Sequence, residues 1–266
     1  SNILLDVKGQ QLSLTGTDLE VELVGRVTLE EVTLEGEITV PGKKLMDIVR
    51  SLPDGSMIEF EQDEQRINIR SGRSRFTLSS LPATEFPNIE EIAGEQPFTV
   101  EQAKLRRVID RVAFAMAQQD VRYYLNGMLL EVNASSLRSV ATDGHRLATC
   151  IVEASGPETQ LQLIVPRKGI LELSKLLTEP EDSVTLLLSP NHIRAETGDF
   201  TFTSKLVDGK FPDYGRVIPK NGNKVILADR QELRQVFART AILSNEKYRG
   251  VRVVLNSGNL QVFANN

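Results

Sequence analysis

Three residues that could perform acid-base chemistry stand within four positions of the chain. In the stretch SVATDGHRLATC, residues 139–150, Asp143, His145 and Arg146 together look like the centre of an enzyme. Such a centre needs a base within hydrogen-bond reach of its partner and a third group that orients it. The chain holds only two histidines, and no HExxH, GxSxG, paired-cysteine or Walker motif accompanies them. We therefore expect no catalytic residue, no metal and no cofactor, and a hydrolase or transferase centred on Asp143 and His145 is the weakest alternative.

The composition indicates a globular protein with room for more than one core. Apolar residues make up 40% of the 266 positions and charged residues 25%, and no run of about 18 apolar residues could cross a bilayer. The opening SNILLDV lacks the charged start of a signal peptide, and Cys150, the single cysteine, has no internal partner for a disulfide. We therefore expect a cytoplasmic protein that does not associate with membranes.

The chain repeats itself with an offset of 125 residues. Three pairs of anchors hold this offset without a gap: Asp18 with Asp143, Pro41 with Pro166, and Phe86 with Phe211. A third copy begins near the end, where Gly250 follows Gly127 and Ala264 follows Ala141 at an offset of 123. We interpret residues 1–95 as a first domain that lacks about 30 residues at its start, 96–223 as a complete second domain, and 224–266 as a third domain that lacks about 70 to 80 residues at its end.

The repeat also separates a structural role from a functional one in the opening motif. Thr17 and Asp18 of the first copy match Thr142 and Asp143 of the second, but Gly-His-Arg at 144–146 has no counterpart. The shared aspartate is typical of a turn in which the side chain accepts hydrogen bonds from neighbouring backbone amides. Gly144 would supply a permissive backbone angle. The residues found only in the second copy need another explanation.

Each copy predicts two helices, each followed by about four short strands. Residues 100–117 place Leu105, Val108, Ile109, Val112 and Ala113 at helical spacing, and residues 167–177 form a second amphipathic pattern after a proline. Strands are expected at GMLLEV, LRSVAT, LATCIV, LQLIVP, VTLLL, HIRAET and FTFTSKL. Most connections are too short for crossovers, so the sheets are expected to be antiparallel and the fold class is α+β with an internal pseudo-twofold.

Cations gather on the expected helices, while acidic residues crowd the strands and loops. A net charge of −5 and aromatic residues at only 5% argue against coating of nucleic acid or a base-stacking platform, but they leave room for one basic face. Such a face would bind phosphates weakly and without sequence preference. The alternative is that these are ordinary solvated helix faces. The cations are Lys43, Lys44, Arg50, Lys104, Arg106, Arg107, Arg111, Arg167, Lys168, Lys175, Arg230, Arg234 and Arg239.

These features together resemble the beta subunit of bacterial DNA polymerase III, the sliding clamp. The strings QDVRYYLNGML, VATDGHRLA, IVPRKG, FTSKLVDGKFPDY and ILSNEKYRGVR carry the resemblance, which covers the whole chain. It implies the DNA clamp fold: repeated domains, each with two helices packed on antiparallel sheets, in a head-to-tail homodimeric ring around duplex DNA. It also implies a non-catalytic processivity factor whose partners are the polymerase III alpha subunit, the clamp loader and other proteins with a clamp-binding motif.

The resemblance assigns three sets of residues. The pocket for partner peptides would be lined by Leu125, Thr142, Gly144, His145, Arg146, Leu147, Pro212, Arg216 and Val217. DNA would be contacted by Lys43, Gln119, Tyr123, Tyr124, Arg167 and Lys168, although either tyrosine could instead pack under the sheet. The dimer interface would use Lys44, Arg73, Arg75, Phe76 and Leu78 on one side and Ile242 and Leu243 on the other. With its expected missing parts, the chain should dimerise poorly and bind motif peptides more weakly than a complete clamp.

A second alternative is a purely structural repeat scaffold. It would not distinguish motif peptides from scrambled ones and would show no salt-dependent retention on closed circular DNA.

Overall fold

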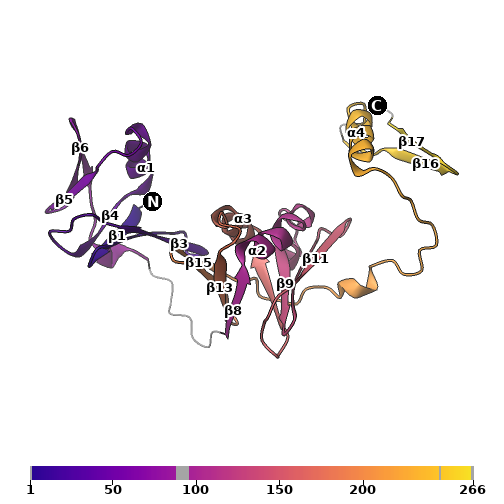
Figure 1. Cartoon of the computed structure of the whole chain (residues 1–266), viewed down its shortest axis with the longest axis horizontal. Coiled ribbons are helices and arrows are strands. Elements are labelled where there is room, and N and C mark those ends of the chain that lie inside the picture. The colour runs from indigo at the N-terminus through magenta and orange to yellow at the C-terminus, as the bar shows by residue number, and fades with distance from the viewer. Residues whose placement is uncertain (1, 88–95, 246, 265–266) are drawn as a thin grey trace. The chain divides into compact units, whose positions relative to one another are not determined.

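A computed structural model describes residues 2–87, 96–245 and 247–264 (Figure 1). The chain divides into two compact units, Ser1–Phe211 and Pro212–Asn266, and each is described separately. No helix among these residues is both long enough and apolar enough to span a membrane.

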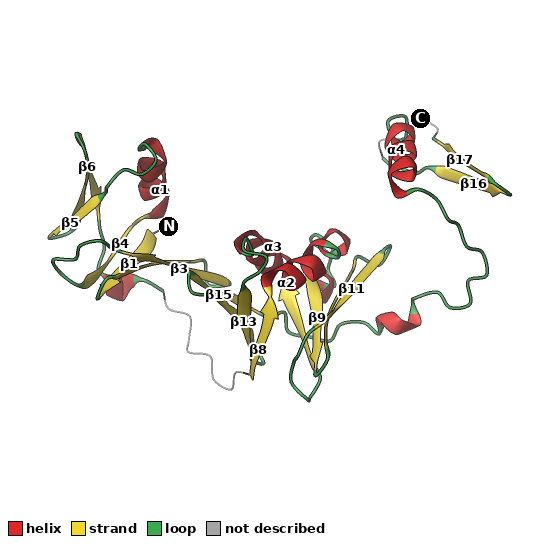
Figure 2. Cartoon of the chain, in the orientation of Figure 1, coloured by secondary structure: helices red, strands yellow, loops and turns green. Residues whose placement is uncertain are grey.

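The first unit consists of antiparallel sheets with helices packed against them (Figure 2). An eight-stranded sheet has the order β4-β1-β2-β3-β15-β14-β13-β8, a four-stranded sheet the order β11-β10-β9-β12, and a three-stranded sheet the order β5-β6-β7. The prediction of an antiparallel α+β fold is confirmed. The strands are β1 Asn2–Lys8, β2 Gln11–Thr17, β3 Val21–Thr28, β4 Gly36–Pro41, β5 Glu59–Asp63, β6 Arg66–Ser71, β7 Ser74–Ser79, β8 Gln96–Glu101, β9 Gly127–Asn133, β10 Ser136–Thr142, β11 Leu147–Glu153, β12 Leu161–Pro166, β13 Ser183–Leu188, β14 His192–Glu196 and β15 Phe200–Lys205.

The strands repeat at the offset seen in the sequence. β1, β2 and β4 begin at residues 2, 11 and 36, and β9, β10 and β12 begin at 127, 136 and 161, so each pair is 125 apart. The two copies share the eight-stranded sheet, because β3 of the first pairs with β15 of the second in a register that sets Leu23 opposite Phe202. Two further hydrogen bonds extend this strand pairing at its ends. The backbone N–H of Arg26 donates to the carbonyl oxygen of Asp199, and that of Lys205 to the carbonyl oxygen of Glu20, both at an N···O distance of 2.9 Å.

The described residues of the first unit form three α-helices: α1 Gly42–Ser51, α2 Gln102–Asp110 and α3 Arg167–Leu176. α1 and α3 both follow a proline, Pro41 and Pro166, whose extended backbone ends the preceding strand. Over the part of the chain that the structure describes there are also four short 3-10 turns: η1 Ala83–Glu85, η2 Ala113–Ala115, η3 Tyr123–Leu125 and η4 Tyr214–Arg216.

The prediction of one helix over residues 100–117 was wrong in length. α2 ends at Asp110, and the chain continues through Val112, at φ −122°, into the separate 3-10 turn η2. Val112, Ala115 and Met116 are all buried. Tertiary packing of these side chains into the core therefore overrides the helical pattern of the sequence after Arg111. The amphipathic pattern itself is confirmed, because Leu105, Val108, Ile109 and Val112 have at most 1% of their surface exposed.

The first unit holds two hydrophobic cores, one for each copy of the repeat. The larger one lies between α2, α3 and the sheets of the second copy and includes Leu105, Ile170, Leu173 and Phe202. The smaller one packs α1 against β1, β4 and β6, with Val40 and Ile69 completely buried. Each copy therefore has its own apolar centre, and the shared sheet joins them.

The second unit contains η4, α4 Arg230–Ala241 and the antiparallel hairpin β16 Arg252–Asn256 and β17 Asn259–Phe263. Asp229 caps α4, because its carboxylate accepts the N–H of Glu232 at 2.8 Å. The cations Arg230, Arg234 and Arg239 of the sequence pattern all lie on this helix.

Candidate functional site

The turn between β10 and β11 carries the residues that looked like an acid-base centre. Asp143 Oδ1 accepts the backbone N–H groups of His145 and Arg146 at 2.9 and 3.0 Å. Thr142 Oγ1 accepts the N–H of Gly144 at 3.1 Å and donates to the carbonyl oxygen of Arg146 at 2.7 Å. The two side chains therefore fold the turn onto itself, and the prediction that Asp143 shapes a turn is confirmed.

The first copy makes the same turn between β2 and β3. Asp18 Oδ1 accepts the N–H groups of Glu20 and Val21 at 3.1 and 2.9 Å, and Thr17 Oγ1 accepts from Leu19 and donates to the Val21 carbonyl. The residue after each aspartate is left-handed, with φ of 74° at Leu19 and 86° at Gly144. The predicted permissive angle at Gly144 is therefore confirmed.

The carboxylate of Asp143 makes hydrogen bonds only to groups of its own turn, among the residues that the structure describes. Its Oδ1 holds the two amides, and its Oδ2 accepts the Nε of Arg146 at 3.0 Å. Partial burial acts to raise the pKa of Asp143, but the amides of Arg146 and His145 and the Arg146 guanidinium stabilise the charged form, so its pKa lies below the ordinary value. Within the described chain no side chain hydrogen-bonds to the His145 ring, so nothing orients it as a general base.

A second loop, residues 119–126, lies against this turn. Arg122 forms a two-pronged contact with Asp120, with Nε to Oδ1 at 3.0 Å and Nη2 to Oδ2 at 2.8 Å. The Arg122 contacts lower the pKa of Asp120 to about 2. Asn126 closes the loop, because its side chain accepts the N–H of Asp120 at 2.9 Å and donates to its carbonyl oxygen at 2.8 Å.

The two loops meet at Gly144. A Cβ atom at this position would stand 3.0 Å from Nη2 and 3.2 Å from Nη1 of Arg122, so the guanidinium packs closely over the glycine. Sequence reasoning assigned no function to Arg122, Asp120 or Asn126. Asp120, Arg122 and Asn126 all belong to the string QDVRYYLNG, and Gly144 belongs to ATDGHR. Nothing in the spacing of the two strings indicated that Arg122 packs over Gly144.

A third segment reaches the same surface from η2. The guanidinium carbon of Arg146 lies 5.4 Å from the centre of the Phe114 ring, and Phe114 is 57% exposed. Arg146 thus contacts Asp143 through its Nε and the Phe114 ring through its guanidinium carbon. The sequence pattern places Phe114 within one helix over residues 100–117 and gives no indication of its contact with Arg146.

The predicted pocket residues divide between the two units. Thr142, Gly144, His145, Arg146 and Leu147 lie together in the β10–β11 turn, with Gly144, His145 and Arg146 exposed. Leu125 is only 2% exposed and therefore supports the surface from below. The remaining three, Pro212, Arg216 and Val217, are in the second unit, where Arg216 forms an ion pair with Asp213 at 2.8 Å and Val217 is 68% exposed.

The predicted DNA contacts lie in three places of the first unit. Gln119, Tyr123 and Tyr124 belong to the loop just described, where the two rings meet edge to face at 5.8 Å. Tyr123 is exposed and Tyr124 is half-buried. Lys43 is exposed at the start of α1, and Lys168 occupies the equivalent position of α3, where it forms an ion pair with Asp18.

Arg167 has a role inside the fold. Its Nη1 points at the carbonyl oxygens of Ala113 and Met116 at 3.5 and 3.4 Å, and its backbone N–H donates to the carbonyl of Asn126 at 2.9 Å. The residue is half-buried and links the start of α3 to both η2 and the 119–126 loop.

The predicted interface residues lie on α1, on β7 and the turn before it, and directly after α4. Lys44, Arg73 and Arg75 are exposed, while Phe76 and Leu78 are half-buried against the smaller core. Ile242 and Leu243 follow α4 and are 77% and 67% exposed. Among the described strands, β7 pairs only with β6, so its other edge is open.

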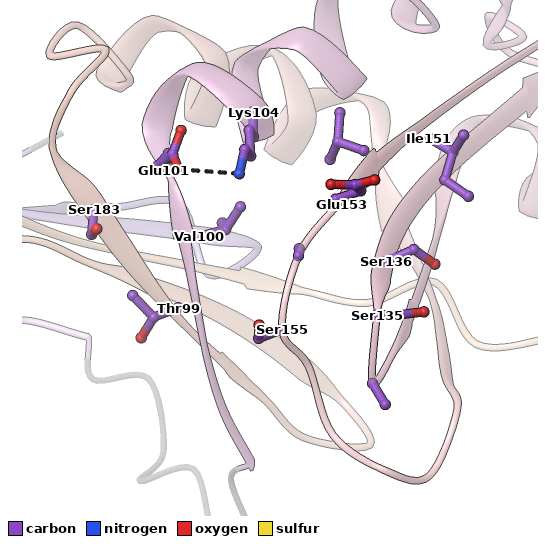
Figure 3. A pocket seen from close by; sticks show the side chains of 13 residues that line it. Thr99, Val100, Glu101, Lys104, Ser135, Ser136, Ile151, Glu153, Ser155 and Ser183 are labelled. Carbon is purple, nitrogen blue, oxygen red and sulfur yellow. Dashed lines mark ion pairs between the residues drawn. The ribbon is translucent and has the colours of Figure 1, made fainter.

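A groove of about 1110 Å³ lies elsewhere on the second copy, between β8 and the chain that follows β11 (Figure 3). Lys104 and Glu101 form an ion pair in it at 3.1 Å, and Ser135, Ser136 and Ser155 contribute hydroxyl groups. None of the predicted site residues lines this groove. Over the part of the chain that the structure describes, no three His, Cys, Asp or Glu side chains converge as a metal site would require.

Comparison with known protein families matches the chain along almost its whole length. Residues 1–90, 99–213 and 215–266 match, in turn, the N-terminal, central and C-terminal domains of the DNA polymerase III beta subunit. Among curated proteins, the beta sliding clamps of Pseudomonas aeruginosa and Escherichia coli K12 are 64% and 51% identical, and the matches cover all of this chain and 73% and 72% of those proteins.

Solved structures give the same result. The crystal structure of the beta subunit from Pseudomonas aeruginosa is similar with a TM-score of 0.96 at 64% identity, and covers the whole chain and 73% of that protein. A clamp of the same organism bound to griselimycin has a TM-score of 0.97 over 72% of its length. A repeated antiparallel fold, a turn without catalytic geometry and these matches lead to one conclusion: the chain belongs to the DNA polymerase III beta subunit family, the beta sliding clamps, which are non-catalytic DNA sliding clamps of the replicative polymerase.

Proposed function

We propose that the β10–β11 turn is one wall of a pocket that captures short peptide motifs of the polymerase III alpha subunit, the clamp loader and other clamp-binding proteins. The observation that carries this proposal is the paired turn. The Thr-Asp framework is the same in both copies, but only the second copy places His145 and Arg146, both exposed, on that framework. The turn in the first copy forms without a histidine or an arginine at these positions. We therefore assign His145 and Arg146 of the second copy a role in binding.

The chemistry of the wall suits a peptide. Arg146 and Arg122 present guanidinium groups that can donate to carbonyl or carboxylate oxygens, and half-buried Leu147 offers apolar contact. That a related clamp binds griselimycin supports a ligand site of this kind in the family.

Isothermal titration calorimetry with griselimycin as the ligand tests the proposal. The variant is His145→Ala, and the matched control is Glu20→Ala, because Glu20 occupies the equivalent position of the turn in the first copy and is also exposed. We expect His145→Ala to weaken binding about tenfold or more, as loss of a well-placed contact does. Glu20→Ala should bind as the wild type does. Equal affinities for all three proteins would contradict the assignment.

We further propose that duplex DNA passes along the basic helix starts and the 119–126 loop. Lys43, Gln119, Tyr123, Tyr124, Arg167 and Lys168 are the proposed contacts. Exposure of Lys43, Gln119 and Tyr123 supports this, while Arg167 would contribute mainly by positioning the loop. Binding should weaken steeply with salt, and each of Lys43→Gln and Lys168→Gln should lower the slope of log K against log salt by about one. Fluorescence anisotropy with a duplex of arbitrary sequence measures that slope.

The seam between the two copies supports the proposed ring. β3 of the first copy pairs with β15 of the second, and the repeat equivalents of these strands, β11 and β7, each have an open edge among the described strands. We propose that β7, with Lys44, Arg73, Arg75, Phe76 and Leu78, pairs with a third domain carrying Ile242 and Leu243 in a second copy of the protein. The proposal includes three domains, at residues 1–95, 96–223 and 224–266, and a cytoplasmic homodimer.

A further inference from the structure

Phe114 contacts the proposed pocket although no motif points to it. We propose that Phe114 is a positioning residue: its ring fixes the Arg146 guanidinium so that the two terminal nitrogens of Arg146 can donate to a carbonyl or carboxylate oxygen of a bound peptide. This inference rests on the proposed function, because it names the group that the same pocket offers to its ligand.

The guanidinium of Arg146 is fixed on two sides. Asp143 Oδ2 accepts its Nε at 3.0 Å, which fixes one edge of the plane. The guanidinium carbon lies over the Phe114 ring, 5.4 Å from its centre. Within the described residues Nη1 and Nη2 donate to no acceptor, so both remain available to a ligand. A planar cation held in this way loses little side-chain entropy when it binds a planar oxygen acceptor.

The backbone below Phe114 is itself fixed. Ala115 and Met116 are buried, and the N–H of Met116 donates to the carbonyl of Ala113 at 3.3 Å. The carbonyls of Ala113 and Met116 also face the guanidinium of Arg167. Phe114 therefore projects from a short hydrogen-bonded turn between half-buried Ala113 and buried Ala115, and its ring is 57% exposed.

The repeat shows that this arrangement serves the second copy specifically. The residue equivalent to Arg146 in the first copy is Val21, which closes the same turn with the same backbone hydrogen bonds. The turn therefore needs no arginine at this position. A cation that the turn does not require, held between a carboxylate and an aromatic ring, is arranged for an external acceptor.

The experiment uses the full chain with griselimycin as the probe. Phe114→Leu keeps the apolar bulk but removes the ring, Phe114→Trp keeps a stronger ring, and Arg146→Met removes the charge. We expect Phe114→Leu to weaken binding about two- to fivefold, the range for a cation–π contact at an exposed position. Phe114→Trp should restore it. In the Arg146→Met background, which is itself weakened, Phe114→Leu should cause no further loss.

A second readout needs no ligand. The ¹⁵N heteronuclear NOE of the Arg146 Nε–H should fall in Phe114→Leu and recover in Phe114→Trp, while that of Arg122, which Asp120 holds, stays unchanged. An unchanged Arg146 signal in Phe114→Leu would overturn the positioning role. Additive losses from the two single substitutions, or no loss from Arg146→Met, would also overturn the proposal. If the wild-type chain did not bind at all, the proposed function and the donor role of Arg146 would both fall, and the NOE would still decide the positioning.

Discussion

Asp18 and Asp143 stand 125 residues apart and make the same turn, each with one carboxylate oxygen on the backbone N–H groups two and three residues further along. One of these turns carries Leu19, Glu20 and Val21, and the other carries Gly144, His145 and Arg146. The same scaffold in two copies, with different residues on it, allows stability and binding to be measured separately in one molecule.

The first prediction uses that pair. Asp143→Ala and Asp18→Ala each leave two turn amides without their acceptor, so each should lower the free energy of unfolding by about 1 to 2 kcal/mol. Urea denaturation followed by circular dichroism measures this. Only Asp143→Ala should also weaken griselimycin, because only it releases Arg146. If Asp18→Ala weakened griselimycin binding as much as Asp143→Ala does, the effect on binding would come from reduced stability and not from the release of Arg146.

A second prediction concerns the left-handed residue at the tip of each turn. Gly144→Ala should lower the free energy of unfolding by about 1 kcal/mol or more, because its φ of 86° disfavours a side chain and the new Cβ would stand 3.0 Å from Arg122. Leu19→Gly is the reverse control, because it places a glycine at the left-handed position of the first copy, where the protein has a residue with a side chain. Relief of strain at φ 74° should offset the entropy of the new glycine, leaving stability within about 1 kcal/mol of the wild type.

What the sequence could predict here depends on how local each interaction is. The Asp143 turn was predictable, because an aspartate that bonds its own next residues needs no knowledge of the rest of the fold. The antiparallel strands and the starts of α1 and α3 were also predictable, because they follow from local patterns that recur in both copies. The interactions that position the site were not predictable, since they join separate segments: Arg122 over Gly144, Phe114 on Arg146, and Arg167 under η2.

The helix prediction shows how a local signal is overridden. VAFAMA continues the apolar content of α2, so the spacing favoured a helix to residue 117. In the structure Val112, Ala115 and Met116 are buried after the helix has ended at Asp110, whereas Phe114 lies at the surface beside Arg146. The apolar composition predicted that most of these residues are buried, but it predicted neither the path of the backbone nor the exposure of Phe114.

A third prediction follows from the low pKa of Asp120. Its folded value of about 2 lies below the ordinary value of 3.8, so the charged form is favoured by folding. The contribution of Asp120 to stability is therefore fully present above about pH 4 and is lost as the pH falls toward 2. Thermal unfolding between pH 2 and 5 should show a steeper loss for the wild type than for Asp120→Asn. Parallel curves for the two proteins would contradict the assignment.

The last prediction tests how the 119–126 loop is held in place by the strand that follows it. Gly127 begins β9, and a Cβ there would stand 2.6 Å from the carbonyl oxygen of Val165 in β12, a backbone atom that cannot move without shifting the sheet. Gly127→Ala should therefore lower the free energy of unfolding by about 1 to 3 kcal/mol. Because Asn126 precedes it and closes the loop on Asp120, the same shift should also weaken griselimycin.

Gly25→Ala is the matched control, since Gly25 also lies in a strand, at ordinary φ and with no atom within 4 Å of the added Cβ. This substitution should leave stability unchanged or raise it by up to about 1 kcal/mol, because alanine reduces the entropy of the unfolded chain. Urea denaturation and calorimetry on both variants separate the two effects. If Gly127→Ala lost stability and kept full affinity, the loop would be positioned by its own hydrogen bonds, and the contact between β9 and β12 would have no part in forming the site.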